Sequence, residues 1–258
     1  MISRAAAAAV LLVSLVNPAS SMAQVEDPYR PWAQVLAKYV DGRGRVDFHG
    51  AAADPAELKS FLDYLARVSP RSADASFAGK DSKIAYFVNA YNALAMFNVI
   101  DSGFPDRLGA VQRFVFFGVK RFSVGGERMS LYTLENDLIR PLGDERVHFA
   151  LNCMSVSCPR LPQEPFRAEH LNQTLDAKAR EFFAEPRNLQ IVPKRKRVRV
   201  SSILKFYHDD FLKKAPTLIA YVNKYRSPPI PQDYEVEFID YDWTVNDQHG
   251  ERSEHASR

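Results

Sequence analysis

The stretch that decides the expected fold is Ser82–Ile100, which reads SKIAYFVNAYNALAMFNVI. At helical spacing, Ile84, Phe87 and Tyr91 lie on one apolar face, and the opposite face is nearly as apolar. A helix that is apolar all round lies in the middle of a core. We therefore predict a single α+β domain, in which this buried central helix packs on a mostly antiparallel sheet.

Two asparagines of this helix, Asn89 and Asn92, lie about one turn apart on an inner face. Buried amides need hydrogen-bond partners. The two side chains either tie down the neighbouring backbone or orient a catalytic group or a substrate carbonyl. The structural role is the commoner one for buried amides.

Both cysteines of the chain lie in Arg146–Leu161, which reads RVHFALNCMSVSCPRL. The alternation in Val147–Asn152 predicts a buried strand. A polar loop with Cys153, Ser155 and Cys158 follows it, and a loop held by a rigid strand is a common layout of a functional site. The simpler alternative is a structural disulfide between the two cysteines.

A carboxylate is predicted on the inner face of another helix. Ser130 is a good N-cap for a helix that ends before Pro141, and Glu135 falls within the apolar stripe of that helix. A carboxylate there must be paired or have a raised pKa. The expected partners are His148 and Arg140, and both a structural ion pair and a role in chemistry stay open.

These residues suggest a thiol-dependent enzyme, a hydrolase or an acyl transferase acting on a small molecule or a peptide. In such a site, Cys153 or Cys158 would be the nucleophile, His148 would activate it, and Glu135 would orient the histidine. The side chains expected to bind the ligand are Asn89, Asn92, Asn152 and Ser155. The alternative is a non-enzymatic binding or interaction domain in which these polar motifs are structural.

Other classes of function find little support in the sequence. The chain of 258 residues has 34 Lys and Arg against 31 Asp and Glu, and a net charge of +3 is too small to indicate nucleic-acid binding. The basic run Pro193–Arg197 is expected at the tip of a hairpin. His148 and the two cysteines would lack a fourth metal ligand, and phosphate and dinucleotide motifs are absent. We therefore expect no metal and no cofactor.

The N-terminus predicts export. Arg4, an apolar run and the small residues around Ala23 are typical of a signal peptide that spans residues 1–23. The apolar run is too short to cross a bilayer, and no later segment is long enough. We expect a periplasmic or secreted protein with one domain over residues 31–246 and a disordered tail over residues 247–258.

Four ordered motifs carry a resemblance to a known family. They are FVNAYNA at 87–93, SLYTLE at 130–135, HFALNCMSVSCPRL at 148–161 and YDWTVN at 241–246. Together they resemble the DUF547 family over about residues 31–246. That family is defined as a domain of unknown function, and its relatives with coiled-coil, DEP or glutaredoxin-like modules imply interaction or thiol-related roles.

A second, weaker likeness concerns the fold. The order of a buried helix followed by a strand histidine is similar to the papain and transglutaminase folds. There the helix would supply the cysteine, whereas Asn89 and Asn92 occupy the helix here.

Overall fold

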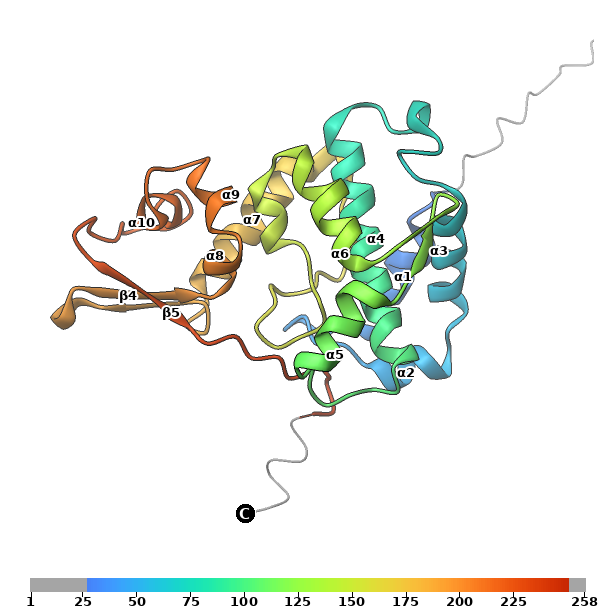
Figure 1. The fold of residues 1–258 in the computed structure, drawn as a ribbon, viewed down its shortest axis with the longest axis horizontal. Helices are drawn as coiled ribbons and strands as arrows, with labels where there is room; N and C mark the ends of the chain where they lie inside the picture. The colour runs from blue at the N-terminus through green and yellow to red at the C-terminus, as the bar shows by residue number, and fades with distance from the viewer. Residues whose placement is uncertain (1–26, 251–258) are drawn as a thin grey trace, which may run out of the picture.

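The computed structural model describes residues 27–250 (Figure 1). The first part is mostly helical, with α1 (Arg30–Tyr39), α2 (Phe48–Ala53), α3 (Ala56–Arg67), the 3-10 turn η1 (Asp74–Ser76), α4 (Gly79–Asp101), α5 (Ala110–Phe114) and the π-helical turn η2 (Val115–Val119). A hairpin of β1 (Phe122–Val124) and β2 (Glu127–Met129) follows. It leads into α6 (Leu131–Thr133), the π-helical turn η3 (Leu134–Ile139) and the 3-10 turns η4 (Arg140–Leu142) and η5 (Glu145–Phe149).

The second part of the chain combines helices with a small sheet. Its elements are η6 (Ala168–His170), α7 (Leu171–Ala184), β3 (Leu189–Val192), η7 (Pro193–Arg195), β4 (Arg197–Ser201), α8 (Ile203–Phe206), α9 (His208–Leu212), α10 (Leu218–Val222) and β5 (Glu235–Ile239). The mixture of helix and sheet confirms the α+β class.

The predicted central helix is α4, which begins at Gly79, two or three residues before the expected start at Asp81 or Ser82. Every residue from Ile84 to Met96 is buried. Because the helix is apolar on all sides, it needs covering on all sides. Its packing neighbours include α2, α3, α6, α7 and η3, so it is covered mainly by other helices.

The strands form two small sheets. β1 and β2 pair antiparallel across the turn at Gly125 and Gly126. In the other sheet, β3 and β4 pair antiparallel and β4 and β5 pair parallel, so two of the three strand pairings are antiparallel. The basic run caps the β3–β4 hairpin as predicted, and two of its side chains pair with acids, Lys196 with Asp233 and Arg197 with Glu237.

Two hydrophobic cores share one helix. The first core surrounds α4, and the second lies between the three-stranded sheet and α8 to α10. Helix α7 contributes Leu171 and Leu175 to the first core and Phe182 and Phe183 to the second. In Figure 1, α7 accordingly lies between α4 and the sheet. The two halves are thereby packed as one domain.

The prediction of a strand over Val147–Asn152 is wrong. This segment forms the 3-10 turn η5, which Asp144 caps by accepting a hydrogen bond from the backbone N–H of Arg146, and then an irregular loop. Val147 faces the first core and Phe149 the second. A segment that is buried between two cores can alternate apolar side chains between them without lying in a sheet. This is why the alternation in Val147–Asn152 did not indicate a strand.

The two ends of the chain are described only in part. Residues 247–250, the start of the expected tail, are hydrogen-bonded to the domain. The side chain of Gln248 donates to Tyr39 O and Arg45 O, at 3.0 Å each. The rest of the expected tail and the expected signal peptide lie outside the described residues. Within residues 27–250, no helix combines the length and the hydrophobicity needed to cross a membrane.

Candidate active site

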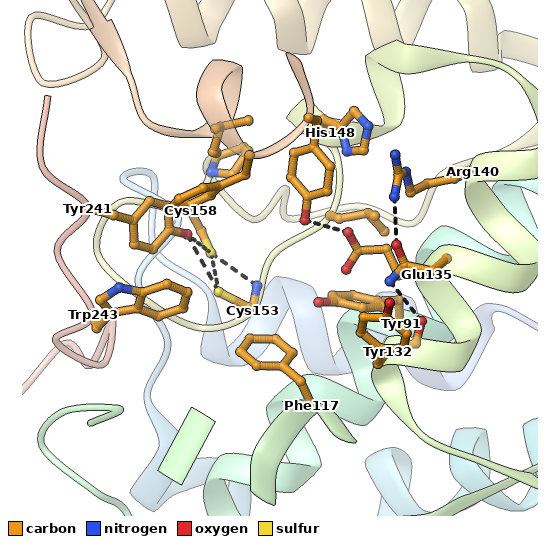
Figure 2. A pocket seen from close by; sticks show the side chains of 16 residues that line it. Tyr91, Phe117, Tyr132, Glu135, Arg140, His148, Cys153, Cys158, Tyr241 and Trp243 are labelled. Atoms are coloured by element: carbon orange, nitrogen blue, oxygen red, sulfur yellow. Dashed lines mark hydrogen bonds between the residues drawn. The ribbon is translucent and has the colours of Figure 1, made fainter. Parts of the chain in front are cut away.

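A pocket of about 420 Å³ lies beside the loop that follows η5 (Figure 2). Its walls are largely aromatic and include Tyr91, Phe117, Tyr132, Phe206, Tyr207, Tyr241 and Trp243. The four predicted catalytic residues, Glu135, His148, Cys153 and Cys158, all line it. The structure therefore brings together side chains from η3, η5 and the cysteine loop, as the sequence suggested.

The two cysteines form a close pair of free thiols in this pocket. Both are buried, and their sulfur atoms lie 2.9 Å apart. That distance is shorter than a non-bonded contact between two sulfurs and longer than the roughly 2.05 Å of a disulfide bond. The pair is thus joined by a hydrogen bond from one thiol to the other sulfur.

Cys158 has the better environment for a thiolate. Its Sγ accepts a hydrogen bond from the backbone N–H of Cys153 at 3.1 Å, and Tyr241 Oη lies 3.2 Å away. Ser155 Oγ lies 3.3 Å from the same sulfur. Burial on its own raises the pKa of Cys158, but the hydrogen bonds from Cys153, Ser155 and Tyr241 outweigh burial and lower the pKa to about 6.

Cys153 is the partner that keeps its proton. Its hydrogen bond to Cys158 and its burial both raise its pKa well above the ordinary value. Two sulfurs that share one proton titrate as a pair. We place the negative charge on Cys158 because this sulfur has both the backbone donor and the shorter contact with Tyr241, which lies 3.6 Å from Cys153.

The shape of the cysteine loop is set by two asparagines. Asn92 donates to Ala150 O at 3.0 Å and accepts from Asn152 N at 2.8 Å. Asn152 in turn donates to Pro159 O at 2.7 Å and accepts from Met154 N at 2.6 Å. Together with the left-handed backbone of Met154, with φ of 65°, these bonds fold the chain back on itself. This fold brings two cysteines five residues apart into contact.

The residues predicted to bind a ligand have structural partners instead. Asn89 donates to Phe166 O and accepts from Phe166 N, at 2.8 and 3.0 Å. Ser155 is fully buried and contacts both sulfurs. None of Asn89, Asn92, Asn152 and Ser155 lines the described pocket. In this geometry they hold the backbone and the thiols in place.

Glu135 is buried as predicted, at 6% exposure, but it has a different partner from the expected ones. Its Oε1 accepts a short hydrogen bond from Tyr207 Oη rather than a bond from His148 or Arg140. Burial and then the charge of Glu135 raise the pKa of Tyr207 well above its ordinary value. Tyr207 therefore stays protonated and remains a donor to the carboxylate.

His148 stacks on the Tyr207 ring and contacts Asp210. The two rings stack with centroids 3.7 Å apart, and His148 Nε2 lies 3.0 Å from Asp210 Oδ2. The bond from His148, and after it that from Arg140, holds the pKa of Asp210 well below its usual range. Neither thiol has His148 as a hydrogen-bond partner among the described residues. The Nδ1 atom of His148 is buried and has no hydrogen-bond partner within residues 27–250.

Sequence reasoning missed Tyr207, Asp210 and Tyr241. Tyr241 opens the motif YDWTVN, so its signal was present although its role was not read. Tyr207 and Asp210 fall in the segment FYHDDF at 206–211, whose polar composition is typical of an exposed segment and gives no sign that these two side chains face the site. Within residues 27–250, no three His, Cys, Asp or Glu side chains are arranged to hold a metal ion.

The comparison with known families covers three of the four motifs and part of the expected extent. A family model described as "Protein of unknown function, DUF547" matches residues 75–183. The DUF547 match covers α4, the cysteine loop and most of α7, and it stops before Tyr207 and Tyr241. No curated protein and no solved structure matches the chain. The expected likeness to papain and transglutaminase folds therefore has no support from known structures.

Proposed function

We propose that this protein is a thiol-dependent enzyme and that its reaction is thiol–disulfide exchange. The observation that carries the proposal is the pair of free sulfurs 2.9 Å apart at a pocket, one of them with a pKa lowered to about 6. A thiolate at neutral pH is the reactive form of cysteine. A second thiol within reach allows the attacked disulfide to be released again.

The exchange proceeds in two displacements. The Cys158 thiolate attacks one sulfur of a substrate disulfide, the substrate S–S bond breaks, and the first substrate thiolate leaves and takes up a proton. Cys153 then loses its proton and attacks Cys158 Sγ, which breaks the mixed disulfide and releases the second thiolate. Two electrons pass from the protein to the substrate, and the protein ends with a Cys153–Cys158 disulfide. Forming that bond requires the sulfurs to approach by about 0.9 Å.

Hydrolysis or acyl transfer is the second candidate. It is favoured by the presence of Glu135 and His148 in the same pocket as the thiols. In this reaction the thiolate would attack a carbonyl carbon, and a positioned acid would protonate the leaving group. His148 is held by Asp210 and Tyr207 instead of by a thiol, so the arrangement supports exchange better. A non-enzymatic binding domain would use the same pocket without a covalent step.

One experiment separates the three candidates. The reduced protein is mixed with hydroxyethyl disulfide, and the mass of the intact chain is followed. We expect the loss of two hydrogen atoms in the wild type, a trapped mixed disulfide in Cys153→Ser and no reaction in Cys158→Ser. A protein that resists the disulfide but cleaves a thioester through Cys158 would instead be a hydrolase or acyl transferase. A protein that does neither would be a binding domain.

We further propose a periplasmic or secreted location, supported by the N-terminal sequence. In such a compartment, disulfides are available as substrates and products. Fusion of residues 1–30 to a reporter enzyme that is active only after export checks this: a reporter that stays inactive would contradict it.

A further inference from the structure

We propose that the pocket binds small disulfides that carry an ammonium group, and that Glu135 is the residue that selects them. This inference rests on the proposed exchange reaction and names the substrate class for it. It is carried by the position of Glu135, by the charges around it and by the aromatic walls of the pocket.

Glu135 is a buried carboxylate that accepts few hydrogen bonds from other side chains. It lines the pocket, and Tyr207 Oη is the only side-chain donor bonded to it among the described residues. Figure 2 shows the second carboxylate oxygen directed away from this bond. Burying a carboxylate is costly unless its oxygens are hydrogen-bonded or paired with a cation. The second oxygen is not among the buried atoms without a partner, and Glu135 lines the pocket, so a ligand cation bound there would pair with it.

The nearby protein cations donate their hydrogen bonds to groups other than Glu135, although Arg140 lines the same pocket and its charge interacts with that of Glu135. Arg140 donates to Asp210 at 2.7 Å and to Asn136 at 2.7 Å. Lys213 and His148 also bind Asp210. Three basic side chains therefore contact the carboxylate of Asp210, whereas the carboxylate of Glu135 has one neutral side-chain donor among the described residues. This uneven distribution leaves the pocket side of Glu135 as the place where a further positive charge is stabilised.

The walls beside Glu135 also suit a cation. Figure 2 places Tyr91 and Tyr132 next to Glu135 and Phe117 between them and the thiols. Aromatic faces attract ammonium groups most strongly where water is excluded. Burial and then the charge of Glu135 raise the pKa of Tyr91 well above its ordinary value, and negative charge on the cysteine pair acts in the same direction. Tyr91 thus lies within the field of both the carboxylate and the thiols.

A matched set of three disulfides tests the proposal. Cystamine carries ammonium groups, hydroxyethyl disulfide is its neutral analogue, and dithiodipropionate is anionic. The rate at which each oxidises the reduced protein is divided by the rate at which it oxidises dithiothreitol, which removes differences in intrinsic reactivity. We expect cystamine to be preferred over hydroxyethyl disulfide by about tenfold, because a hydrogen bond to a charged group contributes more than a neutral one.

The variant Glu135→Gln separates the carboxylate from the thiolate, which also attracts cations. We expect it to lose most of the preference for cystamine, measured within the variant as the ratio of its corrected rates with cystamine and with hydroxyethyl disulfide, since Gln still accepts from Tyr207 but carries no charge. The control is Glu164→Gln, the same change at an exposed position outside this pocket, which should keep the full preference.

The outcomes distinguish the two proposals. If no disulfide oxidises the protein, the exchange reaction itself is refuted. If all three react at equal corrected rates, or if Glu135→Gln keeps the preference, exchange stands and the role of Glu135 is refuted. Should Glu135→Gln fail to fold, the wild type is tested with benzylammonium and benzyl alcohol as blockers of oxidation. Only benzylammonium should slow the reaction, and equal effects of the two would overturn the inference.

Discussion

Replacing Tyr241 with Phe should raise the pKa of Cys158. The change removes the hydroxyl that lies 3.2 Å from Cys158 Sγ. It keeps the ring, whose centroid lies 4.3 Å from that of Trp243 and 5.5 Å from that of Phe206. A hydrogen bond to a charged group contributes about 1.5–3 kcal/mol, and one pKa unit corresponds to about 1.4 kcal/mol. The backbone N–H of Cys153 and the Cys153 thiol remain as donors. We therefore expect the lower end of the range, a rise of about one pKa unit.

The assay is the rate of alkylation by iodoacetamide as a function of pH, together with the ultraviolet absorbance of the thiolate. The wild type should show a midpoint at about 6, and Tyr241→Phe should show one at about 7. Tyr234→Phe is the matched control, since Tyr234 lies outside the pocket, and its midpoint should equal that of the wild type. An unchanged midpoint in Tyr241→Phe, or a wild-type midpoint near the ordinary value of 9, would refute the assigned cause of the shift.

Three further predictions concern stability and the support of the site. First, because the pKa of Cys158 is lower in the folded chain, its stabilising effect is complete above the ordinary pKa of 9 and is lost as pH falls through about 6. The unfolding free energy of the reduced protein should therefore rise by about 4 kcal/mol over this window, and denaturant titrations of Cys158→Ser should lack that rise. Second, Asn92→Ala and Asn89→Ala each leave two backbone groups without their side-chain partner. Each change should lower the unfolding free energy by about 2–5 kcal/mol. In alkylation assays only Asn92→Ala should also change the thiol reactivity, and equal effects would contradict the assigned role of Asn92. Third, because the pKa of Asp210 is lowered in the folded chain, the ionised carboxylate stabilises the fold fully above about pH 4 and less as pH falls further. Asp210→Asn should therefore lower the unfolding free energy by about 1–3 kcal/mol at neutral pH and by less in acid. Disulfide exchange by Asp210→Asn should keep the wild-type pH profile, and a displaced profile would favour a catalytic role for His148.

The features that depend on local periodicity could be predicted from the sequence. The apolar pattern of residues 82–100 gave the buried helix, and helical spacing placed Glu135 inside. The expectation that both cysteines lie at a site with His148 rested on their spacing in one short segment, and the pocket contains all three. In each case the residues that carry the signal are close in the chain.

The partners of these residues could not be predicted, because they come from distant parts of the chain. Tyr207 is 72 residues from Glu135, Asp210 is 62 from His148, and Tyr241 is 83 from Cys158. Periodicity says which side of an element is buried and nothing about what covers it. His148 and Arg140 were the partners expected for Glu135, but the Tyr207 hydroxyl donates to its carboxylate.

The route of the last described residues has a consequence for the timing of reactivity. After β5, the chain returns to the first core, where Val245 pairs with Ser155 and Asn246 N donates to Met154 O. Tyr241 reaches the thiols only when this segment has docked. During synthesis, the cysteines therefore emerge about 80 residues before the hydroxyl that acidifies Cys158. A nascent chain that has not reached Tyr241 lacks that donor, so the lowered pKa of Cys158 depends on the synthesis and docking of this later segment.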